Sequence, residues 1–220
     1  MTANLTILEQ DIRSDIGERQ QLMLQIKTLY LRYQFNERDE KIFLSYSMPA
    51  IYAIWEGFIQ TSFKTYVQEI NKINLSVNTV HKQILCYHIE NSFKQFKQYP
   101  KNYNKKVAFF DKLGEFYGAD IIEITRTINT ENNVGFDVLN RLLAAFNLEK
   151  IPDYYEQRSL KYELDERLLR IRNQVAHGQD SIIVSRNDLE ESINLVNILM
   201  ELVLKRTMIG FSTESYRTQN

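Results

Sequence analysis

Apolar residues near the N-terminus recur at alternating steps of three and four, and this spacing constrains the fold more than any other feature. The series runs from Leu5 to Tyr33, and Arg19 alone interrupts it. Steps of three and four place side chains on one face of an α-helix. The chain is therefore predicted to begin with a long amphipathic helix, whose narrow apolar seam suits lengthwise pairing with other helices.

The rest of the chain is poor in residues that form turns. It has 7 glycines and 3 prolines among 220 residues, too few for a series of short strands. Pro49 either follows a Ser47 cap or kinks one long helix, and we favour the kink because helical spacing continues across it. Helical spacing predicts further helices over residues 42–70, 78–96, 107–117, 136–146, 156–177 and 187–208.

These segments predict an all-α fold of about six to seven helices. No internal repeat, linker or low-complexity segment interrupts residues 1–220, so a single domain is expected. Residues 119–132 are predicted to be extended or irregular, and residues 181–185 to be a strand-like loop. Asn187 and Glu190 have the spacing of a capping box, and we expect the last helix to begin there.

Composition indicates a soluble protein of a reducing compartment. The chain has 27 Lys+Arg and 28 Asp+Glu, 44% hydrophobic residues and 25% charged residues, which is typical of a globular domain. The single cysteine, Cys86, excludes an intramolecular disulfide. The N-terminus lacks the features of a secretory signal, and no uncharged apolar stretch approaches ~18 residues. We expect a cytoplasmic protein that does not span a membrane.

The segment RIRNQVAHGQD, residues 170–180, is the most informative for function. On a wheel of ~100° per residue, five side chains fall within ~80° and define a core stripe: Leu160, Leu164, Leu168, Ile171 and Val175. Asn173 lies about 180° and His177 about 140° from the centre of this stripe, and Arg172 lies nearer its edge. His177 is therefore predicted to face outward in the last turn, which Gly178 closes in a left-handed conformation.

Two structural interpretations compete with a functional one. An outward histidine before a glycine can simply stabilise the negative end of the helix dipole. Arg172 can simply form an ion pair with Glu163, Asp165 or Glu166. Both alternatives remain open at the level of the sequence.

The seven residues RNQVAHG, residues 172–178, resemble the signature of the HEPN superfamily (higher eukaryotes and prokaryotes nucleotide-binding). That signature is an arginine, a polar residue that is most often asparagine, three more residues and a histidine. The segment YAIWEGFIQTSFKTYVQEI, residues 52–70, is also similar to bacterial stand-alone HEPN proteins of toxin–antitoxin and phage-defence loci. The resemblance implies an elongated up-and-down helical bundle that acts as a metal-independent endoribonuclease without a cofactor.

The residues of the motif suit this chemistry. A histidine that titrates near neutrality can move protons, and the fork of Arg172 matches phosphate oxygens. Asn173, one turn before His177, is expected to orient the imidazole or hold the ribose. Acid and base on opposite sides of a phosphate require two histidines, so the resemblance implies a composite site in a homodimer. It also implies a toxin or defence effector with a cognate antitoxin or defence partner.

A lysine-rich segment, residues 94–106, is a second candidate for contact with RNA. It holds five lysines and no acid. The candidate nucleic-acid-binding residues are Lys94, Lys97, Lys101, Lys105, Lys106, Tyr99 and Tyr103. Lysines can contact the phosphate backbone and tyrosines can stack on bases, but a solvated loop explains the segment equally well.

No metal site is predicted. His81 and His88 share a helix with Cys86, but seven residues separate the two histidines by about 10 Å along the axis, too far for one zinc ion. Two rival functions remain beside the nuclease. One is a catalytically inactive HEPN-like protein that binds RNA, and the other is a helical interaction module that partners another effector.

Overall fold

A computed structural model describes residues 2–96, 98–131, 133–178 and 183–218. Seven α-helices lie within these residues: α1 Thr2–Arg32, α2 Glu37–Asn71, α3 Lys82–Ser92, α4 Tyr103–Gly118, α5 Phe136–Ala145, α6 Arg170–Ala176 and α7 Arg186–Ser212. The shorter elements are the 3-10 helix η1 Lys94–Phe96, the π-helix η2 Tyr162–Leu169 and an antiparallel pair of strands, β1 Tyr154–Tyr155 and β2 Arg158–Ser159. The predicted all-α fold is confirmed, and the interpretation of residues 1–220 as one domain stays a prediction.

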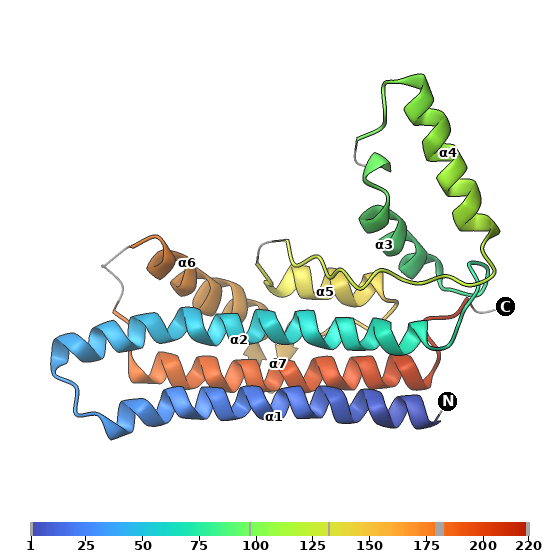
Figure 1. Cartoon of the computed structure of the whole chain (residues 1–220). Coiled ribbons are helices and arrows are strands. Elements are labelled where there is room, and N and C mark those ends of the chain that lie inside the picture. The colour runs from blue at the N-terminus through green and yellow to red at the C-terminus, as the bar shows by residue number, and fades with distance from the viewer. Residues whose placement is uncertain (1, 97, 132, 179–182, 219–220) are drawn as a thin grey trace.

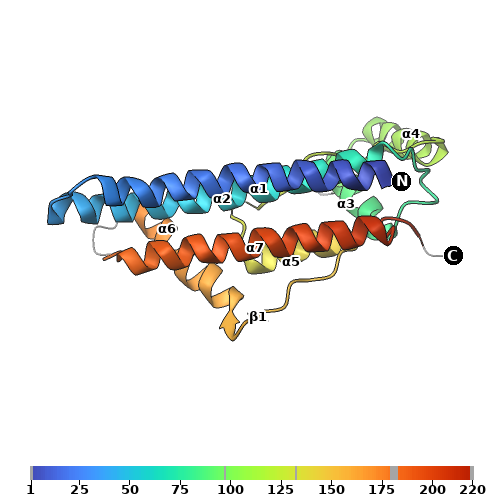
Figure 2. The same cartoon turned by 90° about the horizontal axis from the view of Figure 1, so that it is seen from below.

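Three long helices form the body of the molecule (Figures 1 and 2). α1 runs antiparallel to α2, and α7 packs against both. α5 and α6 lie along one side of this bundle, and α3 and α4 form an arm (residues 82–118) near the end that holds the termini. α6 lies toward the opposite end. The elongated up-and-down bundle that the resemblance implied is present.

The seam of α1 packs against α2 as its spacing predicts. It is buried at Leu8, Ile12, Ile16 and Met23, whereas Tyr33, the last residue of the predicted series, lies after the end of α1 and is exposed. Arg19, which interrupts the seam, reaches across to α2 and donates hydrogen bonds to the Ile54 carbonyl at 2.8 Å and to Thr61 Oγ1 at 3.3 Å. A Cβ at Gly57 would lie 2.9 Å from Arg19 Nη1. Gly57 therefore makes room for the arginine.

α2 is the central helix and continues across Pro49, as predicted. It is long and apolar enough to cross a membrane by length and composition, and half of its most apolar window is buried inside the protein. Trp55, Phe58 and Phe63 on this helix are completely buried. Such burial is typical of the core helix of a soluble protein.

Several predicted boundaries are wrong because side-chain caps decide them. α3 begins at Lys82 rather than near residue 78, after His81 as its N-cap. α4 begins at Tyr103 rather than residue 107, since the Asn102 side chain accepts hydrogen bonds from two backbone amides of the first turn. The capping box of α7 is formed by Ser185 and Asp188, two residues before the predicted one.

The predicted helix over residues 156–177 is wrong at its start, since the helical residues begin at Leu160. Residues 154–159 form the two short strands, with Glu156 and Gln157 in left-handed conformations. The π-helix η2 follows and then α6. The predicted core stripe is buried at Leu160, Leu164, Leu168 and Ile171, although the π-helix turns each residue by less than an α-helix does.

Residues 119–135, which we call the strap, connect the arm to α5 without regular structure in the described part, as predicted. Side chains of α2 and α3 satisfy the strap's backbone. Asn71 exchanges two hydrogen bonds of 2.9 Å with the backbone of Ile124. The Tyr87 hydroxyl donates to the Thr127 carbonyl and accepts from the Asn129 amide. These bonds hold an irregular segment against the bundle.

Candidate active site

The three residues of the motif lie at the end of α6. His177 is the C-cap, and its amide donates to the Asn173 carbonyl at 3.0 Å. Gly178 follows with φ +70°, the left-handed conformation that the sequence predicts. The His177 side chain is exposed, as expected, whereas Asn173 is half-buried and so less open than the wheel predicts. The end of α6 therefore presents an imidazole to solvent beside more enclosed polar groups.

Arg172 is half-buried and is held by two neutral groups. Its Nη1 donates to Asn173 Oδ1 at 2.8 Å. Its guanidinium carbon lies 4.9 Å from the centre of the Tyr52 ring on α2, within the range of a cation–π contact. Asn173 therefore contacts the arginine, and within the described residues no hydrogen bond joins its side chain to His177.

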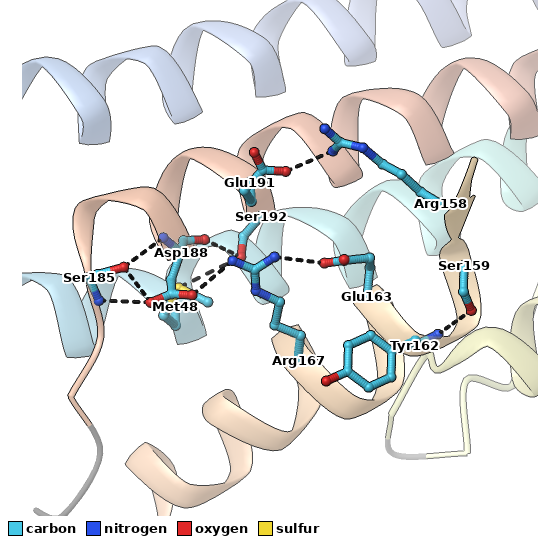
Figure 3. A network of polar contacts seen from close by, with 10 residues as sticks. All are labelled: Met48, Arg158, Ser159, Tyr162, Glu163, Arg167, Ser185, Asp188, Glu191 and Ser192. Atoms are coloured by element: carbon cyan, nitrogen blue, oxygen red, sulfur yellow. Dashed lines mark hydrogen bonds and ion pairs between the residues drawn. The ribbon is translucent and has the colours of Figure 1, made fainter. Parts of the chain in front are cut away.

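Two of the three acidic residues considered as partners of Arg172 bond elsewhere, namely Glu163 (Figure 3) and Asp165. Arg167 lies five residues before Arg172. It pairs with Glu163 at 3.0 Å and with Asp188 of α7 at 2.9 Å. Asp165 accepts a hydrogen bond from the Phe136 amide at 2.8 Å. Among the described residues, no ion pair joins Arg172 to a carboxylate, so its charge is not neutralised locally.

The contacts of Arg167 fix the start of α7, the helix that follows the motif in the chain. The Asp188 carboxylate accepts hydrogen bonds from the Ser185 hydroxyl and amide at 2.6 and 2.9 Å (Figure 3). Burial of Asp188 disfavours its charged form, but the hydrogen bonds from Ser185 and Arg167 outweigh it and lower the pKa of the carboxyl. The start of α7 is thus anchored to η2.

Tyr52 and Trp55 support the site from α2 and were assigned no role from the sequence. The Val134 amide donates to the Tyr52 hydroxyl at 2.6 Å, and Trp55 Nε1 donates to the Val134 carbonyl at 2.9 Å. Burial raises the pKa of Tyr52 to about 12, so the ring under Arg172 is neutral at physiological pH. In the sequence, the only indication of these two residues was their place in residues 52–70, the segment that is similar to HEPN proteins.

The lysine-rich segment lies away from the motif. Lys101, Lys105 and Tyr103 are exposed on the arm, and Lys106 Nζ lies 5.2 Å from the centre of the Tyr99 ring. The Lys94 side chain and the whole of Lys97 lie outside the described residues. The arm and α6 occupy different ends of the bundle in both views (Figures 1 and 2). The structure does not bring the two groups of predicted residues together in one chain.

The histidines near Cys86 have structural roles. His81 caps the start of α3. His88 is buried, accepts a hydrogen bond from the Thr125 amide at 2.9 Å and stacks on Phe116. Burial lowers the pKa of His88, which favours the neutral acceptor that this bond requires. Within the described residues, no group of three or more potential metal ligands is present.

A groove of about 690 Å³ lies between α1 and α7 and is closed at one side by Tyr155 and Glu156. Arg172, Asn173 and His177 are not among its lining residues. His177 is exposed, so a substrate or a second protein surface has access to its imidazole.

An all-helical bundle with an arginine, an asparagine and a histidine in this order at the end of a late helix defines a HEPN-type domain. A family model described as RiboL-PSP-HEPN matches residues 14–206, which is 193 of the 220 residues. The chain belongs to this HEPN family, whose domains are commonly RNases. No curated protein and no solved structure matches the chain significantly.

Proposed function

We propose that the protein is a metal-independent endoribonuclease whose catalytic residues are Arg172, Asn173 and His177. The observation that carries the proposal is the combination at the end of α6. A half-buried guanidinium, with no carboxylate partner among the described residues, lies five positions before an exposed histidine. Arg167 of η2, which has a structural role, pairs with two carboxylates. The charge of Arg172 remains available for an anion.

The reaction that suits these groups uses the 2′-hydroxyl of RNA as the nucleophile. A neutral imidazole removes the 2′ proton while the 2′ oxygen bonds to phosphorus and the bond from phosphorus to the 5′ oxygen breaks. A protonated imidazole gives its proton to the leaving 5′ oxygen. Arg172 stabilises the charge that grows on the phosphoryl oxygens. The products are a 2′,3′-cyclic phosphate and a 5′-hydroxyl end.

A homodimer would supply the two imidazoles. Each chain carries one histidine in the motif, and acid and base act on opposite sides of the phosphate. Ala176 and Gly178 flank His177, are small and are exposed, so a partner can approach closely. Pairing of two copies about a twofold axis at this surface would form one composite site.

The arm would bind the RNA backbone outside the cleavage site. Lys101 and Lys105 are exposed, and Tyr103 is 77% exposed with its ring free to stack on a base. The same exposure supports the second candidate, an inactive RNA-binding protein that partners another effector. The cellular role that we propose is a cytoplasmic toxin or phage-defence effector controlled by an antitoxin or a defence partner.

The test is incubation of the purified protein with total RNA in EDTA, followed by mapping of new ends. New 5′-hydroxyl ends that require Arg172 support the nuclease. RNA binding that weakens with salt, without new ends, supports the inactive binding protein instead. Neither cleavage nor binding would favour a helical interaction module.

A further inference from the structure

Arg172 needs a partner that holds its guanidinium in place without cancelling its charge. A carboxylate would orient the group but would also neutralise it and occupy the donors that face a phosphate. An aromatic face attracts the cation through its quadrupole and leaves the N–H groups at the edge of the guanidinium free. The Tyr52 ring provides such a face at 4.9 Å, and Asn173 takes one N–H donor.

The Tyr52 ring is itself held in a fixed place. Its side chain is 1% exposed, and its hydroxyl accepts the Val134 amide at 2.6 Å. Trp55 binds the carbonyl of the same residue at 2.9 Å. Two side chains of α2 therefore form hydrogen bonds with both polar groups of the Val134 backbone. The strap in this way fixes the tilt of the Tyr52 ring.

The strap also connects back to the helix that carries Arg172. Two residues after Val134, the Phe136 amide donates to Asp165 on η2 at 2.8 Å. A Cβ at Gly135 would lie 2.7 Å from Asp165 Oδ1, so the glycine permits this close approach. Hydrogen bonds thus join Tyr52 to the strap at Val134, and join Phe136, directly after the strap, to η2, which continues into α6.

We propose that Tyr52 is a positioning residue that sets the place and orientation of Arg172 for a phosphate, with the Val134 backbone as its anchor. This inference rests on the proposed function for its catalytic consequence. Tyr52 acts through Arg172 and does not touch the substrate. The Tyr52 ring contacts the guanidinium of Arg172, and the Tyr52 hydroxyl accepts the hydrogen bond from the Val134 amide.

The first experiment compares Tyr52→Leu, Tyr52→Phe and the matched control Phe63→Leu in cleavage of a defined RNA. Phe63 is an equally buried aromatic residue of α2 that packs on Phe146 instead. Tyr52→Leu should lower kcat about 2- to 30-fold with a smaller change in KM. Tyr52→Phe keeps the ring and should recover most of this loss, and Phe63→Leu should keep the parent kcat after correction for its folded fraction.

A double variant separates positioning from general damage to the core. In an Arg172→Ala background, Tyr52→Leu should cause no further loss of kcat, because the group through which it acts is absent. Equal fold losses in both backgrounds would overturn the proposal. Equal losses in Tyr52→Leu and Phe63→Leu would overturn it as well.

A measurement that does not need catalysis keeps this inference distinct from the nuclease proposal. The Nε–Hε resonance of Arg172 in the full chain should show a ring-current shift that Tyr52→Phe retains and Tyr52→Leu loses. With the shift present and no cleavage by the parent, the stacking holds and the nuclease proposal fails. Absence of the shift in the parent overturns the positioning role whatever the activity.

Discussion

Replacement of His177 by alanine should remove RNA cleavage and leave the fold intact. The His177 side chain is exposed at the C-cap, so its loss opens no cavity. The amide of residue 177 can still donate to the Asn173 carbonyl, and Gly178 still supplies the left-handed residue. The remaining cost is the interaction with the helix dipole, about 0.3–1 kcal/mol. At roughly 2–4 °C per kcal/mol for a chain of this size, the Tm should fall by at most about 4 °C.

The effect on catalysis should be far larger than the effect on stability. Proton transfer by a positioned side chain contributes typically ~10²–10⁴-fold to a rate. Single-turnover cleavage of a labelled RNA in EDTA should therefore fall by that factor in His177→Ala. Arg170→Ala is a matched control on the same helix, because Arg170 is exposed and donates to the Glu166 carbonyl. It should cleave at close to the parent rate.

Two results would refute this reasoning. Cleavage at the parent rate by His177→Ala would show that the imidazole carries no proton in the reaction. A loss of thermal stability much above about 4 °C would show that the exposed side chain supports the fold. Either outcome would remove His177 from the catalytic residues.

Three further predictions concern the surroundings of the site. Arg167→Met should reduce the free energy of unfolding by about 1–3 kcal/mol near pH 7, because it leaves the half-buried Asp188 without its cation. The pKa of Asp188 is lowered in the folded protein, so this stabilisation is present above the unfolded value of about 3.9 and is lost as the pH falls through the folded pKa. Urea titrations of both proteins should converge at low pH, and a difference that grows on acidification would contradict the assignment. Removal of Lys101 and Lys105 should weaken RNA binding and reduce the salt slope by about 1.4 if both contact phosphate, whereas an unchanged slope would indicate a solvated loop. Parent protein should sediment at about twice 26.1 kDa, and Ala176→Trp should lower that mass and the cleavage rate together with the fold intact; a monomeric parent that cleaves RNA would exclude the composite site.

Helical spacing in the sequence predicted most of the fold. The seam of α1 and the continuity of α2 across Pro49 follow from local side-chain periodicity, which the structure confirms. The ends of helices were less predictable, because neighbouring polar residues compete to cap the same turn. Ser185 and Asp188 form the capping box of α7, although Asn187 and Glu190 have the same spacing.

The motif itself was readable from the sequence, and its partners were not. Arg172, Asn173 and His177 lie within one and a half helical turns, so periodicity and the glycine after them predicted an exposed histidine at a helix end. The same spacing allowed acidic partners for Arg172, but in the structure Glu163 pairs with Arg167 and Asp165 accepts from the Phe136 amide. A local pattern does not decide which of two nearby arginines meets an acid, because one of the acids that Arg167 binds, Asp188, lies on another helix, α7.

What the sequence determined by itself is the class of fold and the order of the motif, since both depend on contacts within a few residues along a helix. Only the tertiary structure decided which groups surround the guanidinium. Tyr52 precedes Val134 by 82 positions and lies on another helix than Arg172, and no periodicity links residues so far apart. Contact between these residues depends on the path of the strap across the bundle. Side chains of α2 and α3 set that path because they form hydrogen bonds with polar groups of the strap's backbone.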